Sequence, residues 1–246
     1  MNSKFLTEVG DFILLSEFEK HAPGKHNQQS HAGGRGGKSF NNLQDFLADE
    51  DLKWADKAPY AREKYISDML YSQMNGADYI AQAHSGAIAQ YQSNGGKKIN
   101  EALRDPQISD EGYRKQINSL DAAIEEAPAL KEPMEVFRGV TKNVDRDNEF
   151  WSKMEVGDVF EDKGFVSTSL SPKVAADFAY AFQSEAAQGF VFRLKLPTGT
   201  KGLFPVSVRG ADAISGKEAE FLLPRGSKFE LLSKEGKVWE LGLVND

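Results

Sequence analysis

The sequence predicts an α+β protein in which an N-terminal helical lobe packs on a β-sandwich core of two sheets. From Phe40 to Leu130 apolar residues recur at helical spacing, and after Pro133 they alternate along short runs. These runs, about seven in number with few helices between them, favour two packed sheets. Since no long linker separates the two halves, we expect one domain, 39–246, preceded by an N-terminal segment, 1–38.

The N-terminal segment consists of an apolar stretch followed by a linker. Residues 1–20 have apolar side chains at roughly helical spacing, which predicts one short amphipathic helix. Residues 21–38 contain five glycines and three of the four histidines, a composition that cannot form a core. No Asp, Glu or Cys accompanies these histidines, so we predict no metal site there. We also expect residues 1–38 to be dispensable for catalysis.

The helical half contains apolar-periodic runs with recognisable boundaries. Gly95-Gly96 is expected to break one helix, and Ser109 or Asp110 to cap another. The expected helices cover 39–47, 60–69, 78–92, 98–104 and 110–126.

The strand half is expected to contain one helix. Ser171-Pro172 provides a cap and a first-turn proline, and Val174 and Phe178 fall on one face of the helix that follows. Glu235-Gly236 predicts a hairpin between the last two strands. The expected strands cover 134–140, 157–160, 164–170, 190–196, 202–208, 219–223, 228–232 and 237–244.

Composition excludes several kinds of protein. The net charge of −7 argues against a protein that holds nucleic acid by charge alone, although it leaves a local basic groove open. The absence of cysteine excludes disulfides, thiolate metal sites and a cysteine nucleophile. No apolar run approaches the roughly 20 residues of a membrane span. Residues 12–15 lie among acids without a basic leader, so we expect neither a signal peptide nor a membrane anchor.

Glu218-Ala219-Glu220 is the most informative motif of the chain. If this segment enters a strand, alternation with a period of two points both carboxylates to the same face. A pair of carboxylates is a standard device for cleaving a glycosidic bond through a cationic sugar. The alternative interpretation is a Glu-x-Glu sequence on a solvated strand face.

Two further polar signals lie on other expected strands. Arg138 interrupts an apolar strand, and its planar guanidinium group suits phosphate. Gly139 beside it leaves the backbone open to a close ligand. In Ser167-Thr168-Ser169, a buried hydroxyl could hold a carboxylate in one orientation. The alternatives are a structural ion pair for Arg138 and a solvated strand face for the hydroxyls.

In their order and spacing, these three signals resemble the Arg–Ser–Glu class of mono-ADP-ribosyltransferases, which includes the enzymatic domains of clostridial binary toxins. Ile99-Asn100-x-x-Leu103-Arg104 is similar to the Ile-Asn-x-x-Leu-Arg helix of that family. The resemblance spans roughly residues 60–233. It implies a split two-sheet core behind a helical lobe, with NAD as the substrate in the cleft and no metal.

The resemblance also implies a role for each site residue. Glu220 would stabilise the cationic sugar by holding the ribose 2′-hydroxyl, Glu218 would accept a proton from the incoming nucleophile, and Ser167 would orient Glu220. Arg138 would anchor the NAD phosphate, and the Gly139 backbone would meet the nicotinamide amide. Asn100 and Arg104 would contact the phosphates or adenosine. Phe178 would stack on nicotinamide, with core packing as the alternative. The implied NAD-binding set is Arg138, Gly139, Ser167, Thr168, Asn100, Arg104 and Phe178.

The implied activity is NAD-dependent transfer of ADP-ribose to a host macromolecule. Glu rather than Gln at position 218 implies protein arginine as the acceptor, and an acceptor on nucleic acid stays open. Residues 208–215 lack the aromatic that many relatives use to meet a protein substrate, which leaves the target open. The alternative functions are NAD glycohydrolase and an inactive head-assembly protein with this fold.

The linker carries a second resemblance. Residues 21–34, HAPGKHNQQSHAGG, resemble segments of phage head-associated proteins. We expect residues 1–38 to serve packaging, targeting or partner docking, and this resemblance implies packaging into a phage head. The expected location is the cytoplasm of a bacterial host, reached by delivery with a virion, and the alternative is a secreted effector.

Overall fold

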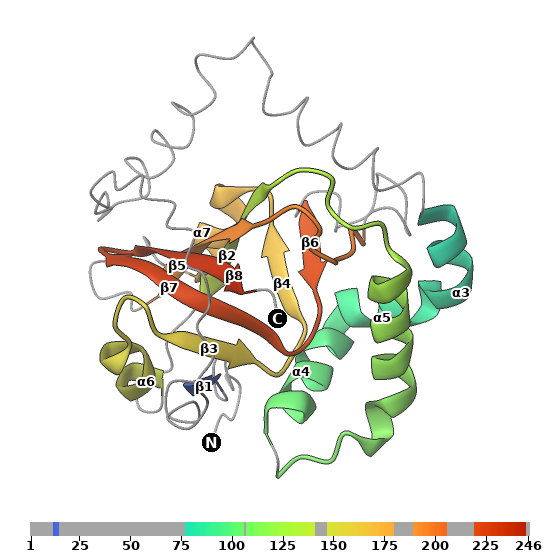
Figure 1. Ribbon diagram of the computed structural model, residues 1–246. Coiled ribbons are helices and arrows are strands. Elements are labelled where there is room, and N and C mark those ends of the chain that lie inside the picture. Colours follow the sequence, from blue (N-terminus) through green and yellow to red (C-terminus); the bar gives the residue numbers. More distant parts are fainter. Residues whose placement is uncertain are drawn as a thin grey trace, which may run out of the picture.

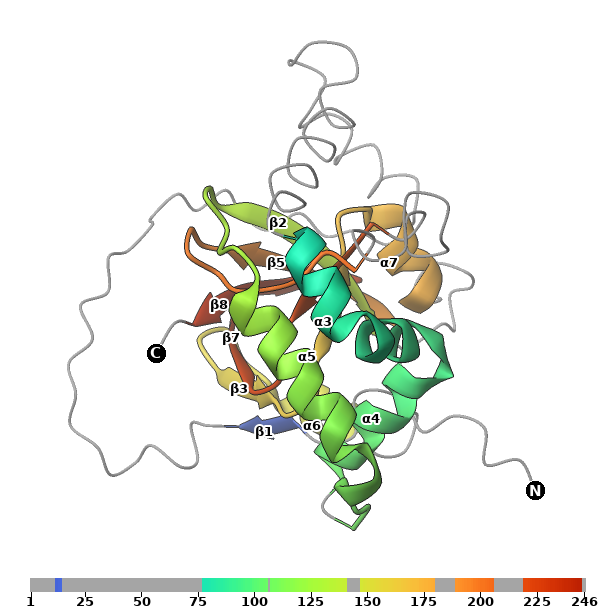
Figure 2. The same ribbon diagram turned by 90° about the vertical axis from the view of Figure 1, so that its right-hand side faces the viewer.

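The computed structural model describes residues 12–14, 77–105, 107–140, 147–179, 189–205 and 219–244. Its helical lobe lies beside the sheet, where α3, α4 and α5 stand in front of the strands in Figure 2. The lobe consists of α3 (Ala77–Gln90), the kinked segment η2 (Tyr91–Gly95), α4 (Gly96–Arg104), the 3₁₀ turn η3 (Glu111–Tyr113) and α5 (Arg114–Glu126). The helices expected over 39–47 and 60–69 lie outside the described residues.

The starts of these helices agree in part with local sequence signals. Ser109 Oγ accepts a hydrogen bond from the backbone nitrogen of Glu111 at 3.3 Å, at the start of η3. α5 itself begins at Arg114, and Tyr113 before it makes no side-chain capping bond, so the cap predicted at Ser109 or Asp110 precedes η3 and not α5. The break predicted near Gly95-Gly96 is confirmed, but it lies two residues earlier, where Ser93 departs from helical dihedrals at φ −90° and ψ −161° and kinks the chain between α3 and α4.

The second half of the described chain contains most of the strands. Its elements are β2 (Met134–Val140), α6 (Asp147–Lys153), β3 (Val159–Asp162), β4 (Val166–Ser169), α7 (Pro172–Ala179), β5 (Phe190–Leu196), β6 (Glu220–Leu223), β7 (Ser227–Glu235) and β8 (Val238–Val244). The sequence did not predict α6. Within the strand expected over 202–208, Leu203 makes only an isolated bridge to Leu222, and residues 206–208 lie outside the described part.

The strands form one mixed sheet in the order β1-β3-β7-β8-β5-β2-β4-β6, where β1 is Phe12–Leu14. The prediction of two packed sheets is therefore wrong for the described strands. In Figure 1, β4 and β6 run across the direction of β3 and β7, so the sheet turns strongly along its width. Alternation in a sequence identifies buried faces, but it does not distinguish one strongly twisted sheet from two stacked sheets.

The short strand β1 pairs antiparallel with β3, with Phe12 opposite Asp162 and Leu14 opposite Phe160. The helix predicted over residues 1–20 is wrong at these three positions. The other residues of the 1–38 segment lie outside the described part of the chain, so the predicted domain boundary stays a prediction.

Three apolar clusters hold the elements together. The largest surrounds Trp151 of α6, whose ring meets Phe160 edge-on at a centroid distance of 5.5 Å. A second joins the helical lobe to the sheet, where Leu120 of α5 shares a cluster with Leu222 of β6. The third packs the alanines of α7 on β2 and β5. The helical lobe is thus fixed to the end of the sheet that contains β4 and β6.

One ionic network lies across β2, β5 and β8. Glu240 on β8 accepts hydrogen bonds from Arg193 at 3.1 Å and Lys195 at 2.9 Å, both on β5. Burial raises the pKa of Glu240, but the hydrogen bonds and charges of Lys195 and Arg193 outweigh it and leave this pKa below its ordinary value. Glu240 therefore binds its proton less readily in the folded protein than in the unfolded chain.

Glu240→Gln should destabilise the protein at pH 7 by about 1 kcal/mol, as for a partly exposed ion pair. Because the folded pKa is depressed, this stabilisation is present above the ordinary glutamate pKa of about 4.3 and is lost as the pH falls below it. Urea unfolding at pH 7 and pH 4 should show a smaller difference between the two proteins at pH 4. Glu235→Gln, on the exposed hairpin end of β7, is the control; an equal effect of Glu240→Gln at both pH values would contradict the prediction.

Candidate active site

The proposed catalytic carboxylate lies on the paired strands β4 and β6. Glu220 is the first residue of β6, is 8% exposed and lies opposite Ser169 in the register. Ser167, two residues earlier on β4, lies opposite Leu222. The pairing of these two short strands thus brings the Ser-Thr-Ser motif beside Glu220.

The backbone before Glu220 differs from the expected strand. Ala219 has a φ of +46°, the left-handed conformation that residues with a Cβ rarely adopt. Alternation along an extended strand therefore does not apply across Ala219, and the prediction that both carboxylates share a face stays a prediction. Glu218 lies outside the described residues, so its predicted role stays a prediction.

Arg138 joins this site from the neighbouring strand β2. Its side chain is 5% exposed, and Nη1 donates a hydrogen bond to the backbone oxygen of Ser167 at 2.8 Å. The structure therefore brings the sequence-predicted Arg138 and Ser167 into direct contact, across the β2–β4 pairing. Its predicted contact with NAD phosphate stays a prediction.

Two residues of η2 complete the described surroundings of Ser167 and Glu220. The hydroxyl of Tyr91 lies 3.1 Å from Ser167 Oγ, and Gln92 Nε2 donates to Glu220 Oε2 at 3.3 Å. Sequence reasoning missed both residues, because it placed them at the end of a helix beside an expected break. The only signal was their position immediately before Gly95-Gly96.

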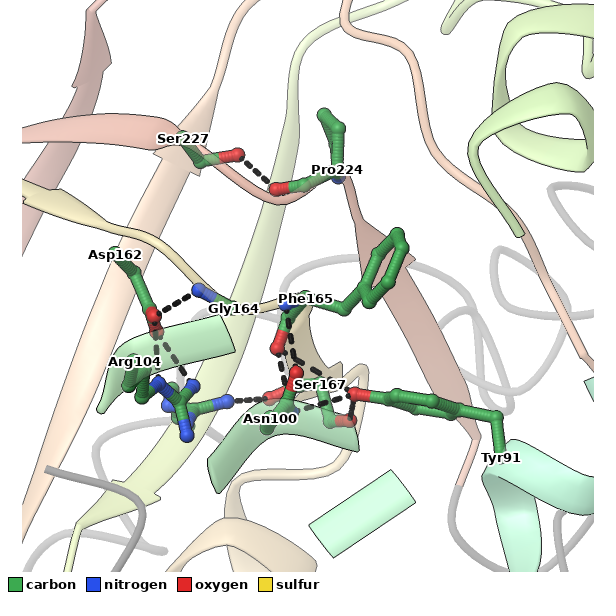
Figure 3. Close-up of polar contacts among 10 residues, drawn as sticks. Tyr91, Asn100, Arg104, Asp162, Gly164, Phe165, Ser167, Pro224 and Ser227 are labelled. Carbon is green, nitrogen blue, oxygen red and sulfur yellow. Dashed lines mark hydrogen bonds and ion pairs between the residues drawn. The ribbon is translucent and has the colours of Figure 1, made fainter. Parts of the chain in front are cut away.

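Asn100 fastens the start of β4 to α4. Its Nδ2 donates to the Phe165 carbonyl oxygen and to the Tyr91 hydroxyl, both at 3.0 Å, and its Oδ1 accepts from the Phe165 backbone nitrogen at 2.8 Å. Figure 3 shows Asn100 between Tyr91 and the backbone of Phe165. Since Ser167 follows Phe165 by two residues, Asn100 fixes the backbone that carries the site hydroxyl.

Arg104 lies one helical turn after Asn100 on α4 and holds the connection between β3 and β4. Its Nε and Nη2 donate to the two carboxylate oxygens of Asp162, each at 2.8 Å, and both side chains are almost fully buried (Figure 3). Asp162 also accepts a hydrogen bond from the Gly164 backbone nitrogen at 2.9 Å. A Cβ on Gly164 would come within 2.8 Å of Asn100 Oδ1, so α4 can approach this closely only because residue 164 is glycine.

The described contacts thus give Asn100 and Arg104 structural partners. Both residues were predicted to contact the phosphates or adenosine of NAD, and that contact stays a prediction. Their described contacts hold the β3–β4 connection in place below Ser167.

Comparison with known proteins agrees with this arrangement of motifs. The family model for the ADP-ribosyltransferase exoenzyme matches residues 54–238, which include every site residue named above. The chain is a member of the ADP-ribosyltransferase exoenzyme family. The matched range begins after the linker, so the phage-head resemblance of residues 21–34 stays a prediction.

Relatives and solved structures of this family span different parts of the chain. A Mycobacterium avium protein, Mav, with the provisional name NAD(+)–arginine ADP-ribosyltransferase, is 28% identical over 151 residues, or 60% of this chain and 16% of that protein. Secreted exoenzyme S of Pseudomonas aeruginosa is 34% identical over 80 residues, or 32% of this chain and 17% of that protein. The chain therefore covers less than a fifth of these relatives' lengths.

Two toxins share the fold over most of their length. Vis toxin from Vibrio splendidus is similar with a TM-score of 0.55 and 21% identity, over 85% of this chain and 89% of that one. Plx2a from Paenibacillus larvae is similar with a TM-score of 0.52 and 21% identity, over 75% of this chain and 95% of that one. The exoenzyme fold, with helices before a mixed sheet, is therefore present here.

Three further residues were predicted from the sequence to bind NAD: Thr168, Gly139 and Phe178. Thr168 Oγ1 donates to the backbone oxygen of Phe221 at 2.6 Å, which ties β4 to β6. Gly139 lies against α7, where an added Cβ would come within 2.1 Å of the Ala175 oxygen. Phe178 on α7 is 59% exposed, so its core-packing alternative is wrong, because α7 packs through its alanines instead. The predicted NAD contacts of these residues stay predictions.

The described residues contain neither a metal-ligand cluster nor a membrane-spanning helix. No cluster of three or more His, Asp or Glu side chains among them has the arrangement of a metal site. In the same residues, no helix combines the length and apolarity needed to cross a bilayer.

Arg104→Leu should lower the free energy of unfolding by about 3–5 kcal/mol, because it leaves the buried Asp162 carboxylate without its cation. Urea unfolding followed by circular dichroism measures this loss. Arg104→Leu combined with Asp162→Asn should recover part of it, since the uncompensated charge is removed. Arg114→Leu replaces an exposed arginine of α5 and is the control. An unfolding midpoint of Arg104→Leu equal to that of the control would show that the ion pair contributes little.

Proposed function

We propose that this chain cleaves NAD and transfers its ADP-ribose to an arginine side chain of a target protein, with release of nicotinamide. The observation that carries the proposal is the buried carboxylate of Glu220 on β6, beside the contact between Arg138 and Ser167, in a member of the exoenzyme family. A carboxylate on β6 and an arginine on β2, with only β4 between these strands, suit the two groups of the substrate, a cationic sugar and a pyrophosphate.

The reaction replaces one bond to the ribose C1′ with another. The bond from C1′ to the nicotinamide nitrogen breaks, and nicotinamide leaves with the electron pair as a neutral molecule. Positive charge then develops on the ribose, where the Glu220 carboxylate stabilises it while holding the 2′-hydroxyl. Arg138 holds the pyrophosphate so that the sugar stays beside Glu220. A guanidinium nitrogen of the acceptor forms the new bond to C1′, and its proton passes to Glu218.

The choice of arginine as acceptor rests on three supports. A guanidinium group is protonated at neutral pH, so it needs a base such as Glu218 to become a nucleophile. The Mycobacterium avium relative carries an arginine-specific name. Vis, which shares the fold, has been crystallised in complex with agmatine, a small guanidinium compound.

The decisive experiment incubates the full chain with NAD labelled in the adenylate part, together with agmatine or a bacterial lysate. We expect released nicotinamide in equal amount to ADP-ribose attached to guanidinium groups, located by mass spectrometry. Nicotinamide release with free ADP-ribose alone would identify an NAD glycohydrolase instead. Absence of NAD binding by calorimetry would identify an inactive protein with this fold.

Glu220→Gln should lower kcat for both transfer and NAD hydrolysis by at least about 100-fold and change NAD affinity little. The reason is that the lost charge acts mainly on the transition state. Steady-state rates and calorimetric NAD titration measure the two effects, and Glu230→Gln on β7 controls for the substitution itself. Near-normal turnover by a folded Glu220→Gln protein would remove Glu220 from the mechanism.

Glu218→Gln should lose arginine transfer but keep much of the NAD hydrolysis, because water needs less activation than a protonated guanidinium group. Both rates should be measured over a range of pH. Parallel loss of the two activities, with a shifted pH profile, would mean instead that Glu218 only tunes the neighbouring Glu220.

A further inference from the structure

We propose that Gln92 is a positioning residue for catalysis, which holds the Glu220 carboxylate in its reactive orientation through the side-chain amide. The proposal rests on the proposed function, because it assigns a second residue to the same site. Gln92 does not belong to the motifs around Arg138, Ser167 and Glu220 from which the site was predicted.

The first observation is the contact itself. Gln92 Nε2 donates to Glu220 Oε2 at 3.3 Å, across 128 residues of sequence. This distance is at the long end for an N–H···O hydrogen bond, as is common for catalytic contacts before substrate binds. An ionised carboxylate only accepts hydrogen bonds, so the amide must present its nitrogen to Glu220. Gln92 Oε1 is thereby left buried without a hydrogen-bond partner in the described structure, at a cost that the Glu220 contact must offset.

The second observation is the backbone that presents Gln92. Adjacent residues of a regular α-helix point about 100° apart, yet Tyr91 reaches Ser167 while Gln92 reaches Glu220. Both residues lie directly before the kink at Ser93, whose φ of −90° and ψ of −161° interrupt the helical path between α3 and α4. Ser93 Oγ donates to the Gln90 carbonyl oxygen at 2.6 Å, which satisfies one backbone acceptor of the disturbed turn.

The two glycines after this turn make it possible. A Cβ on Gly95 would come within 2.5 Å of the Gln90 oxygen, and one on Gly96 within 2.4 Å of the Tyr91 oxygen. The Gly95-Gly96 pair therefore permits the close approach of the chain after the kink, which places Tyr91 against β4 and Gln92 against β6.

The consequence for catalysis concerns orientation. Glu220 begins its strand directly after Ala219, whose φ is +46° and whose carbonyl oxygen accepts a hydrogen bond from the Leu170 backbone nitrogen at 3.0 Å. These features fix the backbone before Glu220 but not the orientation of its side chain. The hydrogen bond from Gln92, which belongs to the helical lobe, restrains the Glu220 side chain. Substrate binding does not need this restraint, whereas stabilisation of the sugar cation does, so its loss should appear in kcat and not in NAD affinity.

The test compares four side chains of similar length at position 92 in the full chain: Gln, Lys, Met and Glu. Lys keeps a donor, Met removes it, and Glu replaces it with a repelling charge. If the donor matters, kcat should fall in the order Gln, Lys, Met, Glu, with Met about 10-fold and Glu about 100-fold below Gln. The dissociation constant of NAD should stay within about twofold throughout. Gln90→Met, two residues earlier at an exposed position, is the control and should match the wild type.

A purely structural role predicts a different order. Met would then be tolerated best, because it fills the same space, and Lys and Glu would both be poor. That order, or a wild-type kcat in a folded Gln92→Met protein, would overturn the proposal. If Gln92→Met does not fold, the comparison of Gln92→Lys with Gln92→Glu still decides. Equal kcat values for these two variants, whose side chains carry opposite charges, would overturn the proposal. A wild-type chain that does not cleave NAD would instead refute the proposed function.

Discussion

The buried ion pair between Arg104 and Asp162, together with the hydrogen bonds of Asn100, is the constraint on which the candidate site depends. Two buried charges are tolerated in a protein interior only when the geometry is good and each partner is satisfied. Here both oxygens of Asp162 are engaged by Arg104, and one also accepts from the Gly164 backbone. Asn100, on the same face of α4, takes both backbone groups of Phe165. α4 thus binds Asp162 and Phe165, at the two ends of the segment that leads into β4, and Ser167 lies two residues beyond Phe165.

This arrangement divides the site between two parts of the fold. The sheet supplies Arg138, Ser167 and Glu220 from three neighbouring strands, β2, β4 and β6, which pair in that order. The helical lobe supplies Tyr91 and Gln92 from the kink between α3 and α4, where Gly95 and Gly96 allow the chain to bend closely. The lobe and the sheet share an apolar cluster, so a change in how they pack alters the contacts of Ser167 and Glu220. The helical lobe therefore contributes residues to the candidate site, as the strands do.

The sequence was sufficient for those features that depend on local pattern or on motif order. Alternation identified most strands, and the ordered set of Arg138, Ser167 and Glu220 identified residues that the structure brings together. It could not identify partners separated by many residues, such as Asp162 for Arg104, because nothing local records such a pairing. It also missed Gln92, whose contact depends on the kink at Ser93, and the left-handed backbone at Ala219, because the residue there is not a glycine. The continuous sheet was missed because strand number and alternation are the same for one twisted sheet and two stacked ones.

We propose that NAD binds with its nicotinamide ribose at Glu220 and its pyrophosphate at Arg138. A crystal structure of the full chain with a non-hydrolysable NAD analogue tests this binding mode. We expect a ribose 2′-hydroxyl within hydrogen-bond distance of a Glu220 carboxylate oxygen and a pyrophosphate oxygen within the same distance of the Arg138 guanidinium. An analogue bound with its nicotinamide ribose away from Glu220, while β4 and β6 keep their pairing, would contradict this binding mode.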